Sequence, residues 1–128
     1  MYRAIIGDQD EWCSVQEPQA QVQALRQRGA DASIRSVGGA AHSFDRLEEP
    51  YTIEEASVAP TAPTVLLADD GAMILPTVGT PDPSATDRDA CVAAIEAGHG
   101  KRGAAIGGVG DQPAIFEADM LAFHRSWS

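Results

Sequence analysis

The chain has 128 residues, of which 44% are hydrophobic and 22% charged, a composition typical of one soluble globular domain. Nine basic residues against nineteen acidic ones leave a net charge of -10, so the mean field repels phosphate backbones and anionic membranes. We therefore expect no nucleic-acid or membrane partner, and no apolar run approaches the roughly 18 residues that a membrane span needs.

The two cysteines, Cys13 and Cys91, are too few for a disulfide framework, and their spacing matches no zinc pattern. We expect both to be reduced thiols in a cytoplasmic protein. No N-terminal segment resembles a signal peptide, and no internal repeat is visible. A single domain over residues 1–128 is the expected organisation.

The first part of that domain, residues 1–45, predicts a strand, a helix and a second strand. Ala4 to Ile6 is an apolar run without alternation, which indicates a parallel strand buried on both faces. Strong helix formers follow from Pro18 to Arg28, and Gly29 ends them. Asp31 to Val37 alternates in polarity as a strand does. This spacing predicts a βαβ unit with a right-handed crossover.

Two loops follow the predicted strands at the same edge of the sheet. In open parallel sheets the ligand lies beyond the carboxyl ends of the strands. The loops at Asp8 to Cys13 and Gly38 to Asp45 should therefore face one crevice. We expect Asp10 and His42 to lie within reach of each other.

Residues 46–112 predict an irregular insertion that contains a hairpin and a helix. Residues 46–63 are acidic and contain three prolines, which favours an irregular connection. Asp70-Gly71 within the apolar run of residues 64–75 favours a β-hairpin, with one strand and a loop as the alternative.

A helix is predicted after this hairpin. Thr86, with Asp89 three residues on, resembles a capping box that opens a helix through about Ala97. Gly98 to Gly110 is rich in glycine, and we expect a mobile connection there.

Residues 113–128 predict a terminal amphipathic helix, which Asp111 and Pro113 begin. One apolar stripe has offsets of 0, 4, 7 and 11 and is formed by Phe116, Met120, Phe123 and Trp127. We expect this stripe to be the best-buried helical face in the chain.

The motifs that follow the two predicted strands are Gly7-Asp8-Gln9-Asp10 and Gly38-Gly39-Ala40-Ala41-His42-Ser43-Phe44-Asp45. They resemble the dienelactone hydrolase family of the α/β-hydrolase superfamily, which has a strand ending in G-x-x-D, a helix, another strand and a G-x-x-H-x-F type segment. Asp10 matches the acid of that family, His42 its histidine and Phe44 the aromatic that follows. The acid precedes the histidine here, as it does in those hydrolases. The resemblance is close over residues 1–45 only, apart from the final helix.

The resemblance implies a partial α/β-hydrolase-like parallel sheet and an ester or lactone as substrate. In that family the histidine takes a proton from a nucleophile, while the acid holds its other ring nitrogen and stabilises imidazolium. No G-x-[SC]-x-G pentapeptide occurs in the chain. Cys13 lies just after the acid and Ser43 beside the histidine, and no strand-to-helix elbow carries Ser14, Ser33 or Ser36. A complete sheet of this type also needs roughly 200 residues.

We therefore expect the C-terminal part of a hydrolase that is inactive or nearly so alone, and whether it is an enzyme by itself stays open. A truncated or split gene is the simplest explanation, with the missing half lost or supplied by another chain. The alternative is a non-catalytic module that self-associates or binds a partner chain through an exposed strand edge.

Several other residues have weaker motif support. Asp8 is a second candidate for the acid, although the family spacing favours Asp10. Gly98 to Arg102 lacks the pattern of a phosphate loop, and Gly107 to Gly110 lacks that of a dinucleotide site. Asp10, Glu11 and His42 could be imagined as metal ligands together with His99 and His124, but no ligand spacing supports this. We expect neither a metal nor another cofactor.

Overall fold

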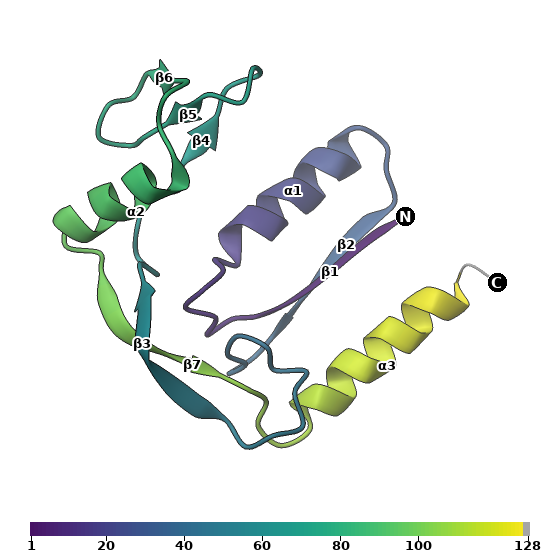
Figure 1. The fold of residues 1–128 in the computed structure, drawn as a ribbon. Helices are drawn as coiled ribbons and strands as arrows, with labels where there is room; N and C mark the ends of the chain where they lie inside the picture. Colours follow the sequence, from purple (N-terminus) through teal and green to yellow (C-terminus); the bar gives the residue numbers. More distant parts are fainter. Residues whose placement is uncertain (127–128) are drawn as a thin grey trace.

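The computed structural model describes residues 1–126 and shows a mixed α/β fold (Figure 1). Within these residues the elements are β1 (Tyr2–Gly7), α1 (Gln16–Gln27), β2 (Ala32–Val37), β3 (Tyr51–Val58), β4 (Leu66–Leu67), β5 (Met73–Ile74), β6 (Pro81–Asp82), α2 (Asp87–Glu96), β7 (Lys101–Ile106) and α3 (Gln112–Arg125). The strands pair as β1-β2, β3-β7 and β4-β5-β6. Over the same residues, no helix has the length and apolar character required to cross a membrane.

The strand, helix and strand predicted for residues 1–45 are confirmed. β1 and β2 pair in parallel, from Tyr2 opposite Ala32 to Gly7 opposite Val37. The helices α1 and α3 lie on opposite faces of this pair (Figure 1). α1 buries Val22, which is 1% exposed, and its Arg26 donates a hydrogen bond to the carbonyl of Ala32 at 2.7 Å.

Side chains alternate between the two faces of the β1-β2 pair, as strand geometry requires. Ile5 and Val37 pack with Phe116 of α3 in one apolar cluster. On the same face Arg35 forms an ion pair of 2.8 Å with Asp119 of α3. α3 is therefore held to the sheet by apolar contacts at its start and by charge further along.

β1 is less buried than the prediction of a strand covered on both faces. Ala4, Ile5 and Ile6 are only partly buried. Within residues 1–126, β1 pairs with β2 alone, so the parallel sheet has two strands. A strand with one partner keeps part of its apolar surface exposed.

Two predictions for residues 46–112 are wrong. The acidic stretch of residues 46–63 contains β3, and the glycine-rich stretch of residues 98–110 contains β7, where we expected irregular or mobile connections. The two strands pair in antiparallel fashion with a register shift between Ile53 and Ser57. That bulge interrupts the alternation of β3, since Ile53, Ala56 and Val58 all pack in one cluster with Ala104.

The hairpin and the capped helix are confirmed, although the hairpin strands are short. β4 and β5 pair over two residues each, and Gly71 takes a positive φ of 85° in the turn between them. The edge strand β6 was not predicted. Thr86 and Asp89 form a capping box at the start of α2, and Gly98 follows its end with φ 85°.

The predicted terminal helix is confirmed as α3, but its apolar stripe is not the best-buried helical face. Phe116, Met120 and Phe123 are partly buried, whereas Val22 of α1 is fully buried. Trp127, the fourth residue of the predicted stripe, lies outside the described residues. Gln112 at the start of α3 is buried and donates a hydrogen bond to the carbonyl of Gly38 at 3.3 Å.

Candidate functional site

The loops after β1 and β2 are fastened to each other by their backbones. A Cβ atom on Gly7 would lie 2.1 Å from the carbonyl oxygen of Ala40, so only glycine permits this approach. The N–H of Gln9 donates to the same carbonyl at 3.0 Å, and the N–H of Asp8 donates to the carbonyl of Val37 at 3.1 Å. These contacts fix the spacing between the two loops.

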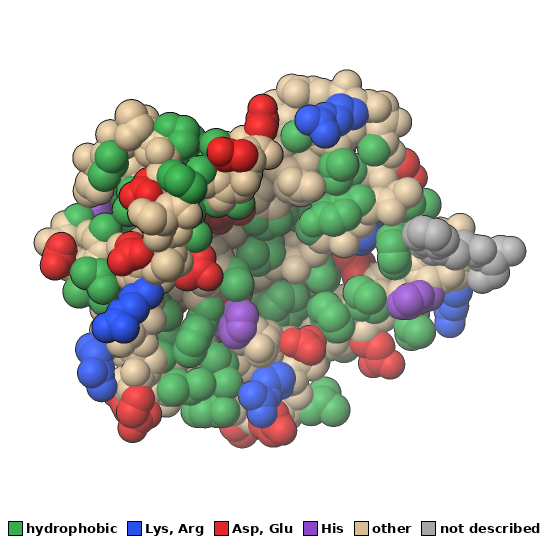
Figure 2. Space-filling view, turned by 45° about the horizontal axis from the view of Figure 1, so that its top comes forward, with side chains coloured by type: hydrophobic (Ala, Val, Ile, Leu, Met, Phe, Trp, Pro, Cys, Tyr) green, Lys and Arg blue, Asp and Glu red, His purple; other side chains and the backbone are tan. Residues whose placement is uncertain are grey.

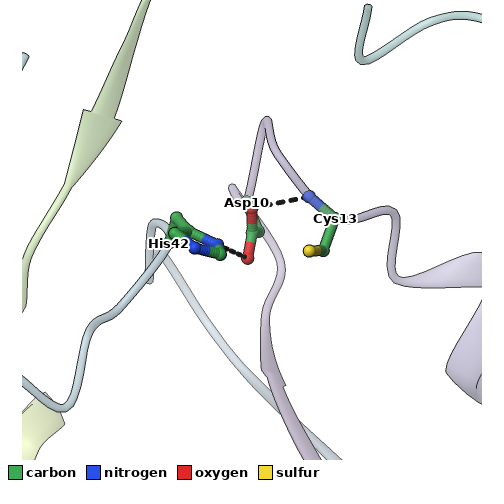
Figure 3. A group of neighbouring side chains, drawn as sticks. All are labelled: Asp10, Cys13 and His42. Carbon is green, nitrogen blue, oxygen red and sulfur yellow. Dashed lines mark hydrogen bonds and ion pairs between the residues drawn. The ribbon is translucent and has the colours of Figure 1, made fainter. Parts of the chain in front are cut away.

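This junction brings Asp10 and His42 together, as the spacing predicted. Nδ1 of His42 lies 2.9 Å from Oδ2 of Asp10, whose side chain is 7% exposed (Figure 3). Oδ1 of Asp10 accepts hydrogen bonds from the N–H groups of Trp12 at 2.8 Å and Cys13 at 2.9 Å. The buried carboxylate therefore has donors on both oxygens.

The hydrogen bonds assign the roles of the two ring nitrogens. An ionised carboxylate can only accept, so Nδ1 of His42 carries the proton that it donates to Asp10. In a neutral ring, Nε2 is then the acceptor. Among the described residues, Asp10 is the one hydrogen-bonding partner of the His42 ring.

Neighbouring residues set the orientation of His42. Its carbonyl accepts from the N–H of Gly107 at 2.9 Å, and its backbone forms a bridge with Ile106 of β7. The Trp12 ring lies 5.6 Å from the imidazole, centroid to centroid. Ser43 has a positive φ of 52°, and the chain turns there so that Phe44 is buried while His42 stays about one third exposed at 35%.

Asp8, the second candidate for the acid, has a different position. Its carboxylate accepts a hydrogen bond from the backbone N–H of Gly39 at 2.7 Å and so links the loop after β1 to the loop after β2. Asp8 helps to hold the junction, and Asp10 contacts the imidazole.

The structure also places the Cys13 side chain beside this pair, whereas the sequence predicted only that Cys13 lies in the same loop as Asp10. One ligand-type atom from each of Asp10, Cys13 and His42 lies within 4.8 Å of the others. Partial burial of the thiol raises the pKa of Cys13, and the negative charges of Asp10 and Glu17 raise it further. The sequence signal for this proximity is the Asp10-x-x-Cys13 spacing within one loop. An aspartate in a turn accepts a hydrogen bond from a backbone N–H a few residues on, and here the Cys13 N–H donates to Asp10.

The three side chains border open hollows. One hollow of about 300 Å³ is lined by Asp10, Cys13, His42 and the apolar residues Ile5 and Phe44.

A second hollow, of about 360 Å³, lies between the start of α1 and the segment before β4. Glu11 and Glu17 contribute to its wall, and Figure 2 shows acidic side chains near a hollowed part of this face. Glu11 forms an ion pair with Lys101 of β7. Because both hollows are open, small molecules and ions can reach Asp10 and His42 from solvent.

The other residues named as candidates from the sequence lie away from Asp10 and His42. Nδ1 of His99 is hydrogen-bonded to the hydroxyl oxygen of Thr61 at 3.0 Å, and His124 is exposed on α3. The segment from Gly107 to Gly110 connects β7 with α3. None of the three contributes a side-chain partner to Asp10 or His42 within residues 1–126.

No family model, curated protein or solved structure matches the chain. The geometry by itself defines a class of site, which is a buried carboxylate that orients a partly exposed histidine beyond the carboxyl ends of two parallel strands. Such a pair can hold and move a proton, but it contains no attacking group of its own.

Proposed function

We propose that this chain is the acid and histidine portion of an ester or lactone hydrolase of the dienelactone hydrolase type. The observation that supports this best is the 2.9 Å contact between the buried Asp10 carboxylate and Nδ1 of His42. Asp10 fixes the tautomer and stabilises the imidazolium that forms when Nε2 takes a proton. General-base assistance of this kind is worth about 10²- to 10⁴-fold in rate.

The nucleophile in this proposal comes from outside residues 1–126. Figure 3 shows Asp10 between His42 and Cys13, with the thiol directed at the carboxylate. A thiol in this position faces an acceptor that is already hydrogen-bonded, and its raised pKa keeps it protonated at neutral pH. Cys13 is therefore a poor substitute for the missing nucleophile.

Chemical rescue tests the proposal directly. The purified chain is assayed on p-nitrophenyl acetate with and without a small added thiol, which supplies the missing nucleophile. We expect the chain alone to be no faster than its His42→Ala variant, and the added thiol to produce turnover that both His42→Ala and Asp10→Asn lose. The loss in His42→Ala should be about 100-fold or more.

A matched histidine provides the control. His124 is exposed on α3 and takes no part in the pair, so His124→Ala should behave like the unaltered chain. Equal rescue in the unaltered chain and in His42→Ala would contradict the proposal.

Within residues 1–126 one edge of β1 has no partner strand, and this edge supports a second candidate, a module that associates through β1 with another copy or a different chain. The Tyr2 N–H donates to the carbonyl of Asp31, on the side of β2. Because partners alternate along a parallel strand, the N–H groups of Arg3 and Ile5 point to the opposite edge. Exposed edges of this kind invite pairing with a further strand.

Light scattering separates this candidate from the first. Association through β1 predicts a dimer or larger species that Arg3→Pro reduces to a monomer, because proline removes an N–H at the free edge. A monomeric unaltered chain would exclude self-association through this edge.

A further inference from the structure

The loop geometry at Asp10, Cys13 and His42 resembles the arrangement that a metal ion requires. Their candidate ligand atoms lie within 4.8 Å of one another. A tetrahedral zinc ion with bonds of about 2.0 to 2.3 Å separates its ligand atoms by about 3.3 to 3.8 Å. Rotation of the exposed Cys13 side chain and an approach of about 1 Å would therefore complete the set.

The positions of these three residues are fixed without any ion. Asp10 and Cys13 belong to one turn, which is held by the 2.9 Å hydrogen bond from the Cys13 N–H to Oδ1 of Asp10. His42 comes from the neighbouring loop, which Gly7 and Ala40 hold against the first. The 2.9 Å between Nδ1 and Oδ2 is a hydrogen-bond distance, and these two atoms would move apart by about 0.4 Å to become ligands of one ion.

The chemistry of the donors selects the kind of ion. A thiolate, an imidazole nitrogen and a carboxylate suit Zn²⁺ or Co²⁺, whereas Mg²⁺ and Ca²⁺ prefer oxygen ligands alone. The surroundings are also negative, because Glu17 acts on Cys13 and the whole chain carries a net charge of -10. A divalent cation relieves the repulsion between these groups.

We propose that Asp10, Cys13 and His42 bind one Zn²⁺ or Co²⁺ ion, with a fourth coordination position open to water. On binding, the metal forms bonds to Sγ, to a carboxylate oxygen and to Nδ1. The thiol proton leaves to solvent, and the imidazole proton moves from Nδ1 to Nε2, so the ring stays neutral.

This inference goes beyond the proposed function and limits it. An occupied site places the imidazole proton on Nε2, the nitrogen that the hydrolase proposal needs as a base. The metal and the acid–base pair therefore exclude each other, and Zn²⁺ should suppress the thiol-rescued turnover until a chelator removes it.

Cobalt absorption tests the site without reference to activity. Co²⁺ is titrated into the chain with its thiols reduced, and a thiolate-to-cobalt charge-transfer band in the near ultraviolet is followed. Calorimetry with Zn²⁺ then gives the stoichiometry and the affinity. We expect one ion per chain, and displacement of the cobalt band by Zn²⁺.

Variants assign the ligands. Cys13→Ser should abolish the cobalt band, and Cys13→Ser and His42→Ala should each weaken Zn²⁺ binding by about 100-fold or more, since losing even an outer-shell partner costs about 10- to 100-fold. Cys91→Ser is the matched control, because Cys91 is the other exposed cysteine and lies in α2. Circular dichroism verifies that each variant is folded.

Two results would overturn the site. One is the absence of a band with excess Co²⁺, and the other is a band that Cys91→Ser removes and Cys13→Ser retains. Either result leaves the hydrolase proposal standing, because that proposal is tested by rescue with a thiol in the absence of metal.

Discussion

The junction between the β1 and β2 loops and the region formed by β4 to β6 with α2 are stabilised in different ways. At the junction, residues about 30 positions apart in the sequence are joined by backbone hydrogen bonds, by Asp8 and by the Asp10–His42 contact. In the second region the strands are two residues long, Leu66 and Leu67 are 58% and 65% exposed, and α2 has no buried residue.

The difference shows where a site can be held rigidly. Close packing of distant segments leaves few alternative positions for Asp10 and His42. In the second region the hydrogen bonds of the described residues are mostly local, such as the Thr86–Asp89 capping box and the turn at Gly71. We therefore expect substitutions at the junction to have large effects and substitutions in α2 to have small ones.

The largest effect is expected at Gly7. Gly7→Ala places a methyl group 2.1 Å from the Ala40 carbonyl, and the backbone must move to accept it. Destabilisation should exceed about 3 kcal/mol, with loss of the Asp10–His42 contact. Thermal unfolding measures the change. Gly38→Ala is the control, because no atom lies within 4 Å of its Cβ position, and a comparable loss there would contradict the explanation.

A smaller but still large effect is expected at Phe44, which is 6% exposed in the cluster with Val37 and Ala40. Phe44→Ala should cost about 3 kcal/mol, because it leaves a cavity between the sheet and α3. Leu47→Ala removes a side chain that is 92% exposed and should have almost no effect. Urea denaturation of the two variants makes the comparison, and equal losses would show that the cluster is not a core.

In α2, Thr86→Ala removes the hydroxyl that accepts the N–H of Asp89. The expected loss is about 1 kcal/mol, typical of an N-cap threonine. Helix content by circular dichroism during thermal unfolding gives the value. A loss as large as that of Phe44→Ala would mean that α2 is coupled to the core more tightly than its exposure indicates.

The smallest expected effect is a pH dependence at the same cap. Hydrogen bonds from the Thr86 hydroxyl and then from its backbone hold the pKa of Asp89 below its usual value. Because the pKa of Asp89 is lower in the folded chain than in the unfolded chain, its carboxylate stabilises the fold at pH values above the unfolded pKa. This stabilisation is lost as the pH falls through the folded pKa. The difference in melting temperature between the chain and Asp89→Ala should be constant from about pH 7 to pH 5 and should shrink as the pH falls below about 4. A difference that stays unchanged as the pH falls from about 4 to about 2 would contradict the assignment.

The sequence was sufficient wherever local signals agreed with each other. The βαβ unit, the Asp70-Gly71 turn and the Thr86 capping box all follow from residue types at fixed spacing. The proximity of Asp10 and His42 was also predictable, since both follow parallel strands at one edge.

Other features depend on contacts that no local pattern shows. The bulge in β3 breaks its alternation, and Gly103 and Ala104 give β7 a weak strand propensity. Cys13 joins the pair only through the shape of one turn. Phe116, Met120 and Phe123 of α3 stay partly exposed because β1 has one partner strand in the described residues, which composition could not reveal.

The central claim is that Asp10 holds the proton of His42 on Nδ1 and leaves Nε2 as the base. Nitrogen-15 NMR of the imidazole, in metal-free chain and in Asp10→Asn, measures this tautomer directly. We predict a protonated Nδ1 and an unprotonated Nε2 in the neutral ring, with a shift toward the other tautomer in Asp10→Asn. Identical ring-nitrogen shifts in the two proteins would contradict the claim.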